Sequence, residues 1–434
     1  MAIYLKKFST HAEYETYIAS EDKVLPNVSI CTTEGDVHYN PYVPPHDYSQ
    51  DYFTMVVTVG GNIKWSGSTT ANTLSCSKDN GDNWSAVTSA DTISVVEGDK
   101  VLWKGTTTPR PDYGIGKFSG ATDVRYSVEG NAMSLLFGDD FKGQTSLSGG
   151  KSYAFYGLFS GNTNVTSAKN MSLPATTLAN YCYQYMFYGC TSLTTAPKLP
   201  ATTLTSGCYR GMFNGCTSLT TAPELPATTS KYYCYRSMFE GCTSLTTAPE
   251  LPATTLEESC YDHMFYGCTS LTTAPELPAT NLSGANYCYQ NMFYGCTSLT
   301  TAPSVLPATT LASMCYNGMF NGCTSLTTSP SVLPATTLAS NCYAYMFSGC
   351  TSLTTAPELP ATTLATKCYN GMFNGCTSLS SIKCLATDIS ASNCTYNWVN
   401  GVASSGTFTK AESMSSWSTG TSGIPNGWTV VDAA

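Results

Sequence analysis

Apolar positions recur along most of this chain with one fixed spacing. The pattern LPATTLxxxCYxxMFxGCTSLTTAPx is written eight times between Leu173 and Leu379, with a step of 26 residues that lengthens in places to 27 or 28. The Met of each Met-Phe pair marks the step: Met186, Met212, Met238, Met264, Met292, Met319, Met346 and Met372. A period of this length predicts a solenoid, in which each repeat buries its apolar side only against its neighbours.

Within one repeat the pattern predicts a short strand, a turn and a short helix. Leu193 and Ala196 bracket two β-prone threonines, and Pro197 ends the run, as expected for a brief strand in a parallel sheet. After the turn, residues 208–213 place Cys-Tyr and Met-Phe at i, i+1, i+4 and i+5, which is the spacing of a helical face. Gly215 follows as the expected C-cap, so we expect short strands on one side of each repeat and short helices on the other.

The sequence around the repeats predicts caps and a separate β domain. Degenerate copies of the Met-Phe-x-Gly position lie at residues 158–161 and 398–401, as expected for terminal repeats that face water on one side. Short β-rich runs at residues 53–59 and 100–104 flank Gly, Asn and Asp turns, which predicts a small Ig-like β-sandwich. The expected domains are an extended attachment segment (1–47), the β-sandwich (48–111), an N-terminal cap with a degenerate first repeat (112–172), the repeats (173–397) and a C-terminal cap (398–434).

Composition and charge argue against several classes of function. Charged residues make up 11% of the chain and the net charge is −9, so the basic face that nucleic-acid binding requires is missing. No apolar run approaches the ~20 residues of a membrane span, and the first residues lack the apolar run of a secretory signal. We therefore expect neither nucleic-acid binding nor membrane insertion. The missing signal favours a protein released by lysis, such as a virion component, or a surface protein already trimmed of its signal.

Sixteen of the twenty cysteines occupy two positions of the repeat that lie eight residues apart, as in Cys182 and Cys190. A helical segment of eight residues rises ~12 Å, which exceeds the Cα separation of a disulfide. We therefore expect two columns of buried free thiols, with disulfides between neighbouring repeats as the alternative. Closely spaced cysteine pairs are missing and the four histidines are scattered, so neither a zinc site nor a cofactor is expected.

Two motifs raise the question of catalysis. Residues 77–84 match the S-x-D-x-G-x-x-W Asp-box of sialidases, and a glycosidase is the sharper hypothesis. A single copy in a chain with few arginines instead favours a β-hairpin, in which Asp79 caps the turn and Gly81 takes a positive φ. The adjacent Asp139 and Asp140 raise a catalytic or calcium hypothesis, but two acids without further oxygen ligands favour a solvated turn. We therefore do not expect an enzyme.

The repeat resembles the BspA-like leucine-rich repeats. That family reads A-F-x-x-C-x-x-L-x-x-I-x-I-P, and here Met-Phe-x-Gly-Cys-Thr-Ser-Leu-Thr-Thr-Ala-Pro follows the same order, with Met for Ala and Ala for the strand Ile. The resemblance covers about half of the chain. It implies a leucine-rich-repeat solenoid used for adhesion and recognition, commonly in gut bacteria and their phages, and it does not imply an enzyme.

A second resemblance covers the first 46 residues. Residues 8–18, 25–29 and 37–41 look like a leader shared by structural proteins of crAss-like and related Bacteroidales phages. The resemblance implies a docking peptide that attaches the protein to a particle. An ordinary edge of the β domain is the alternative.

Tyrosines at the variable positions of the repeat are the candidate binding residues. The Tyr after the first Cys is present in all eight copies, which packing explains, whereas the positions beside it and beside Met-Phe vary. The variable tyrosines are Tyr181, Tyr185, Tyr188, Tyr232, Tyr233, Tyr266, Tyr287, Tyr294 and Tyr345. Tyr among Asn, Ser and Gly is typical of adaptable binding surfaces, although unselected surface variation explains the same pattern equally well.

These observations predict a phage virion fibre or decoration protein that presents its repeats for adhesion to a host surface glycan or protein. Other virion proteins are the expected partners of residues 1–47, and a homo-oligomer is compatible with the sequence. The expected location is the virion surface. The alternative is a bacterial cell-surface BspA-like adhesin that lacks its export signal.

Overall fold

The chain divides into two units, Met1–Asp47 and Tyr48–Ala434. The computed structural model describes residues 29–31, 37–39, 46–69, 73–415 and 417–433. In the first unit, β1 (Ser29–Cys31) pairs antiparallel with β2 (Val37–Tyr39). The expected attachment segment, residues 1–47, lies almost entirely outside the described residues, so its role stays a prediction.

The second unit begins with two sheets. One has six strands in the order β11-β10-β3-β8-β5-β6, and the other has three in the order β7-β4-β9. The strands are β3 (Phe53–Val59), β4 (Gly61–Gly67), β5 (Leu74–Ser77), β6 (Ser85–Val87), β7 (Ile93–Val95), β8 (Lys100–Lys104), β9 (Gly116–Gly120), β10 (Arg125–Asn131) and β11 (Val165–Ser172). The expected strands at residues 53–59 and 100–104 are therefore confirmed.

Side chains from the two sheets meet in one core. The ring of Phe118, on β9, lies 4.9 Å from that of Trp103, on β8, and 4.8 Å from that of Trp65, on β4. All three side chains are fully buried. The expected Ig-like topology goes beyond this contact and stays a prediction. Three short helices flank the sheets: η1 (Tyr48–Gln50), α2 (Ser134–Phe137) and η2 (Gly138–Phe141).

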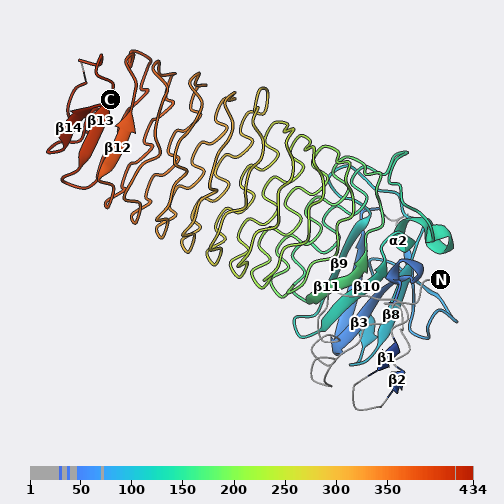
Figure 1. Ribbon diagram of the computed structural model, residues 1–434. Coiled ribbons are helices and arrows are strands. Elements are labelled where there is room, and N and C mark those ends of the chain that lie inside the picture. The colour runs from blue at the N-terminus through green and yellow to red at the C-terminus, as the bar shows by residue number, and fades with distance from the viewer. Residues whose placement is uncertain (1–28, 32–36, 40–45, 70–72, 416, 434) are drawn as a thin grey trace. The chain divides into compact units, whose positions relative to one another are not determined.

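Strand β11 connects the six-stranded sheet to the repeats. It pairs parallel with β10 on one side, and on the other its Ser167 forms a parallel bridge with Thr195 of the first full repeat. An uncovered edge strand would offer unpaired backbone groups to other chains. Here the repeats continue the pairing, as Figure 1 shows where the green coils leave the sheet.

The repeats stack with their threonines in register, but their pairing is shorter than predicted. Thr195 bridges Thr221, and Thr221 bridges Thr247, each as a single parallel bridge in place of the expected short strand. Proline follows two residues after each of these threonines and has no N–H to donate. The ladder therefore stops after one residue in the middle of the array.

The prediction of a short helix in each repeat is wrong. The segment around Cys-Tyr-x-x-Met-Phe is a ribbon of consecutive turns, called here the turn ribbon and spanning residues 179–190 in the first full repeat. Every second N–H closes a turn in its own repeat, as Tyr183 receives a bond from Met186 (3.2 Å). The alternate N–H groups donate to the next repeat, as Tyr183 does to the carbonyl of Cys208 (3.0 Å).

Backbone conformation explains why the turn ribbon is not helical. Tyr181, Tyr185 and Gly189 have φ values of +58°, +56° and +67°, so every fourth residue is left-handed. An α-helix requires right-handed φ at each residue. The apolar pairs recur every four residues in this ribbon, close to the helical period of 3.6, which is why the sequence pattern fits both structures.

Two columns of stacked rings fill the core of the repeats. The ring centroids of Tyr183 and Tyr209 lie 5.6 Å apart with planes 6° from parallel, and those of Phe187 and Phe213 have the same spacing and angle. The tyrosines of this column are about 1% exposed, which confirms that packing accounts for them. Phe155 stacks on Tyr183 at one end, and Trp398 stacks on Tyr369 at the other.

The cysteines form two further columns. Each of the nineteen cysteines whose side chain the structure describes is a free, buried thiol, so the predicted burial is confirmed. The second thiol of each repeat donates to a phenylalanine carbonyl of the preceding repeat, as Cys216 does to Phe187 at 3.1 Å. These bonds tie neighbouring repeats together inside the core.

The array ends in a small parallel sheet formed by β12 (Ser381–Cys384), β13 (Thr407–Lys410) and β14 (Thr429–Asp432). Trp398 is fully buried next to this sheet and donates from Nε1 to the carbonyl of Gly423 at 2.8 Å. Trp398 stands at the Met position of a full repeat, and its indole covers the last rings of the columns, Tyr369 and Phe373.

Candidate functional site

All nine candidate tyrosines lie on the turn ribbon. Tyr188 and Tyr345 are exposed, at 44% and 41%, and the other seven are half-buried. The Cys, Tyr, Met and Phe that repeat along the ribbon are buried, whereas the candidate tyrosines between them stay at least partly open to solvent. The structure therefore places the predicted residues on one element, repeated along the array.

The N-terminal rings of this surface stack on one another. The ring centroid of Tyr181 lies 5.0 Å from that of Tyr153, and Tyr185 lies 5.8 Å from Tyr156 and 5.6 Å from Tyr188. Sequence reasoning missed Tyr153 and Tyr156. Both occupy the degenerate first repeat, 28 residues before Tyr181 and Gln184, and aligning that repeat with the full ones would have found them.

Two arginines extend the ring contacts across the next repeats. The guanidinium carbon of Arg210 lies 5.8 Å from the ring centroid of Tyr185 and 5.3 Å from that of Tyr233. The guanidinium carbon of Arg236 also contacts Tyr233, at 4.9 Å from its ring centroid. Tyr233 also packs against Tyr232, with ring centroids 3.8 Å apart. The Tyr233 hydroxyl, with desolvation as the second cause, raises the pKa of Tyr232 to about 12.

The contacts continue to a third group of rings. Arg236 pairs with the buried carboxylate of Asp262 (Nε to Oδ2, 3.0 Å), and Asp262 also contacts Nδ1 of His263. The His263 ring stacks on Tyr266 at 5.3 Å, and Tyr266 stacks on Tyr294 at 4.7 Å with planes 3° from parallel. Desolvation, together with Tyr294 and Glu240, raises the pKa of Tyr266.

These contacts define one continuous patch, called here the tyrosine surface. It consists of Tyr153, Tyr156, Tyr181, Tyr185, Tyr188, Arg210, Tyr232, Tyr233, Arg236, Asp262, His263, Tyr266 and Tyr294. Within the described part of the chain, no ring contact joins Tyr287 or Tyr345 to it. The structure thus brings seven of the nine predicted tyrosines together and leaves two apart.

Glycines in the following repeat make room for the tyrosines. A Cβ atom added at Gly211 would lie 2.4 Å from Cε1 of Tyr185, and one added at Gly207 would lie 2.3 Å from Cδ1 of Tyr181. Each ring therefore lies flat against the backbone of the next repeat. This packing holds the rings in place while one side stays open to solvent.

A second surface follows the bridged threonines. Successive Ala-Pro-x-Leu-Pro turns leave shallow grooves of about 450 Å³ between neighbouring repeats. One groove is lined by Ala196, Pro197, Lys198, Leu199 and Pro200 together with Ala222, Pro223, Glu224 and Pro226. These grooves are lined mainly by proline and alanine and lack the ring contacts of the tyrosine surface.

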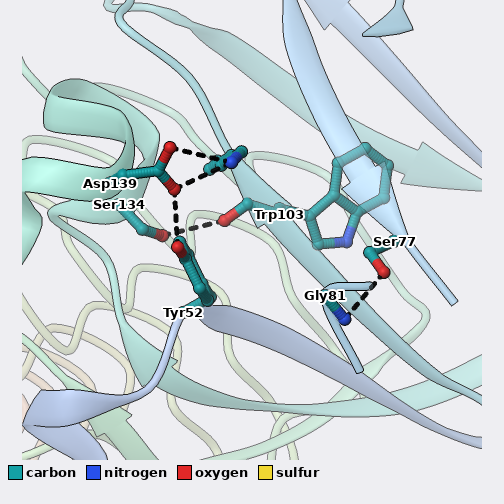
Figure 2. A network of polar contacts seen from close by, with 7 residues as sticks. Tyr52, Ser77, Gly81, Trp103, Ser134 and Asp139 are labelled. Carbon is teal, nitrogen blue, oxygen red and sulfur yellow. Dashed lines mark hydrogen bonds and ion pairs between the residues drawn. The ribbon is translucent and has the colours of Figure 1, made fainter. Parts of the chain in front are cut away.

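The Asp-box forms the predicted hairpin between β5 and β6. Asp79 accepts hydrogen bonds from the backbone N–H of Asn83 (3.0 Å) and from the Ser77 hydroxyl (2.6 Å), and Gly81 has a φ of +98°. These bonds, that of Ser77 first, lower the pKa of Asp79 to about 2. Figure 2 shows the Gly81 N–H pointing to the Ser77 hydroxyl, which accepts this bond. The motif therefore serves the turn, as predicted.

Asp139 lies on the predicted solvated turn, with its side chain 65% exposed, and in addition it pairs with neighbouring side chains. Its carboxylate receives hydrogen bonds from Lys104 Nζ (2.7 and 3.0 Å) and from the Tyr52 hydroxyl, and Figure 2 shows it directed toward Tyr52. Lys104, and then Tyr52, lower the pKa of Asp139. Asp140 is exposed, as expected. The carboxylate therefore links η2 to Lys104 of β8 by an ion pair and to Tyr52, directly before β3, by a hydrogen bond.

The described ranges contain neither a metal-binding cluster nor a helix suited to spanning a membrane. Nowhere in them do three or more His, Cys, Asp or Glu side chains gather in an arrangement able to hold a metal ion. None of the helices there combines the length and the apolar character that crossing a membrane requires.

Comparisons with known proteins agree with the repeat pattern. The family model described as BspA type leucine rich repeat region matches residues 151–299, 210–353 and 286–410, which together cover more than half of the chain. No curated protein matches.

Two solved structures are similar, with TM-scores too low to show a shared fold. A leucine-rich repeat protein from Bacteroides ovatus is 16% identical over 64% of this chain and 86% of its own, with a TM-score of 0.23. A leucine rich cell surface protein from Faecalibacterium prausnitzii is 15% identical over 54% and 75%, with a TM-score of 0.21. On the strength of the family match over residues 151–410, the chain belongs to the BspA-type leucine-rich repeat family.

Proposed function

We propose that this protein is a surface adhesion protein that holds a host glycan or protein on its tyrosine surface. The observation that carries the proposal is the continuous series of ring, cation–π and ion-pair contacts from Tyr153 to Tyr294. Tyrosine offers a large contact area at low entropy cost together with a polar hydroxyl. A patch of stacked, half-open rings therefore fits a ligand with flat apolar faces and hydroxyl groups.

Binding by this surface is expected to be distributed over many rings. One exposed aromatic contact contributes on the order of 1 kcal/mol, so a single Tyr→Ala change should weaken adhesion only several-fold. Losses should accumulate as further rings are removed, because a repeat array offers several similar contacts side by side.

The experiment measures the binding of two variants to host cells, each with several tyrosines replaced by Ala. Replacing Tyr185, Tyr188, Tyr266 and Tyr294 together by Ala should reduce binding far more than any one of these changes. The matched control replaces Tyr345 and Tyr396, which are exposed at 41% and 53% and make no ring contact with the tyrosine surface in the described chain. Circular dichroism confirms folding of both variants. Unchanged adhesion of the quadruple variant would place the receptor contact elsewhere, with the proline-lined grooves as the next candidate.

We further propose that the carrier is a phage virion, to which residues 1–47 attach the protein through other virion proteins. The resemblance of that segment to a phage leader supports this proposal. The alternative is a bacterial cell surface, which the membership of a BspA-type family favours. Co-purification of the native protein with capsids fits only the virion, whereas recovery with the cell envelope of uninfected bacteria fits only the alternative.

The proposed role is binding without turnover, and the chain needs no cofactor for it. The Asp-box is the feature that argued for a glycosidase, and its Asp79 is occupied by turn hydrogen bonds. Release of shorter sugars from a bound glycan, followed by chromatography, would contradict a purely adhesive role.

A further inference from the structure

The tyrosine surface contains one cation with no acidic partner. Arg210 lies between the rings of Tyr185 and Tyr233, at 5.8 and 5.3 Å from their centroids. Within the described part of the chain, its guanidinium makes no ion pair and no hydrogen bond. The residue is only partly buried, so part of its surface is open to solvent.

The neighbouring arginine provides a contrast within the same protein. Arg236 occupies the same position one repeat later and contacts the same ring, that of Tyr233. Its guanidinium, however, is neutralised by the Asp262 carboxylate at 3.0 Å. Two equivalent arginines therefore differ in one respect, which is that the protein supplies a carboxylate to one and leaves the other without a counter-ion.

Other charges near Arg210 do not take the place of that counter-ion. Asp112 and Arg210 act on the pKa of the same tyrosines, Tyr153 and Tyr156, in opposite directions, yet no ion pair joins the two. Glu258 lies close enough to act on Tyr232. Only five basic residues occur between Leu173 and Leu379, against eight acidic ones, so Arg210 is an isolated cation and not part of a basic patch.

We propose that Arg210, together with Tyr185 and Tyr233, binds an acidic sugar unit of the glycan, either a uronic acid or a sulfated sugar. This inference rests on the proposed function and names the ligand class of the same site. An arginine fork can donate two parallel hydrogen bonds to a carboxylate or sulfate, and the flanking rings offer faces on which the sugar can stack. The ligand's anion takes the place that Asp262 fills beside Arg236.

The rings also hold the guanidinium ready for a ligand. An arginine stacked on aromatic faces has lost part of its rotamer freedom before binding, which lowers the entropy that binding costs. The net charge of −9 repels polyanions in general, so a preference for acidic glycans requires a local site.

Two pairs of probes test the inference, and the members of each pair share one polysaccharide backbone and differ in its charge. Polygalacturonate is compared with its methyl ester, and dextran sulfate with dextran, by calorimetry at low and at moderate salt. We expect at least one acidic probe to bind about tenfold more tightly than its neutral partner, a difference of ~1.4 kcal/mol, and to weaken as salt is raised. The acidic probe that binds identifies carboxylate or sulfate as the ligand group.

Substitutions assign the preference to Arg210. Arg210→Gln should remove the preference, so that the acidic and the neutral member of a pair bind equally, and Arg210→Lys should retain part of it because the charge stays but the fork is lost. The control is Lys367→Gln, which makes the same charge change at an exposed position of the turn ribbon. Circular dichroism reports folding of each variant.

Two results would overturn the inference. One is equal binding of acidic and neutral probes by the unmodified protein, and the other is an equal loss in Arg210→Gln and Lys367→Gln. Either result leaves the adhesion proposal standing, because that proposal is decided by the cell binding of the quadruple tyrosine variant.

Discussion

Tyrosine and glycine occupy the same position of the turn ribbon in successive repeats. Tyr185 is followed by Gly211 and Tyr345 by Gly371, and in both pairs a Cβ atom on the glycine would lie 2.4 Å from Cε1 of the ring. All four residues have a positive φ, between +56° and +60°. A tyrosine adopts this conformation at some cost in energy. Glycine adopts it freely, and because it has no Cβ it also leaves space for the ring of the preceding repeat.

A double-mutant cycle separates these two roles of the glycine. Gly267→Ala is expected to cost about 1–2 kcal/mol from its φ of +69° alone, because nothing lies within 4 Å of the added Cβ. Gly211→Ala should cost roughly 1–2 kcal/mol more, since the ring of Tyr185 must move. In a Tyr185→Ala background the extra cost should disappear. Urea unfolding gives the free energy of unfolding of each variant. If the extra cost of Gly211→Ala persists in the absence of Tyr185, contact between the tyrosine ring and this glycine is not its cause.

The turn ribbon is the element in which the observed backbone differs from the predicted short helix. Its alternate N–H groups donate to the next repeat, so each ribbon depends on its neighbour for half of its backbone hydrogen bonds. The thiol columns act in the same direction, because the second cysteine of a repeat donates to the preceding one, as Cys242 does to Phe213. Backbone and side chains thus tie the same pairs of repeats together.

Burial of the thiols predicts a loss of stability at alkaline pH. Desolvation raises the pKa of Cys208, Cys260 and Cys296 to about 12, whereas a cysteine in the unfolded chain has a pKa of ~8.5. Above pH ~8.5 the unfolded chain releases protons that the folded chain retains, so the free energy of unfolding falls as pH rises. Each buried thiol lowers the free energy of unfolding by up to ~1.4 kcal/mol for each pH unit in this range.

The measurement is the urea midpoint between pH 7 and 10.5. We expect it to be flat up to about pH 8 and to fall steeply above pH 9, because many thiols contribute together. Alkylation followed by mass spectrometry provides the control: nearly all cysteines should react after denaturation at low pH, and few in the native protein. A midpoint that is independent of pH up to 10, or cysteines already paired, would contradict free buried thiols.

At the scale of the whole molecule, the repeats depend only on their neighbours. Each ring of the two aromatic columns contacts the equivalent rings of the adjacent repeats. Phe155 and Phe159 begin the two columns, and Trp398 ends both. Stability in such an array is close to a sum of repeat and interface terms. The length of the array is therefore adjustable as long as both caps remain.

Deletion of one complete repeat tests this additivity. Removing residues 307–333 joins Leu306 to Pro334, which keeps the Leu-Pro-Ala-Thr-Thr sequence in phase and leaves every residue of the tyrosine surface in place. The shortened protein should keep its circular dichroism spectrum and its adhesion, with only a modest fall in Tm. Removing residues 307–319 is the control, because half a repeat breaks the register of every column. Equal damage by both deletions would contradict a neighbour-only array.

The sequence by itself determined the period, the family and the identity of the buried residues. A repeat that recurs every 26 residues places equivalent side chains above one another in any stacked arrangement, whatever the local backbone. For this reason Leu193, Cys190, Tyr183 and Phe187 could be assigned to the core without coordinates, and all four are buried. The hairpin at Asp79 was equally local, because its capping bonds span only a few residues.

Only the tertiary structure decided the backbone of the ribbon and the composition of the candidate site. Apolar pairs every four residues fit a helix and a turn ribbon alike, and hydrogen bonds to the next repeat select the ribbon because they satisfy the N–H groups that a helix would use internally. Whether a variable tyrosine joins a surface depends on which side chains stand in the repeats on either side of it. That is why Tyr153 and Arg210 join the tyrosine surface and Tyr345 does not.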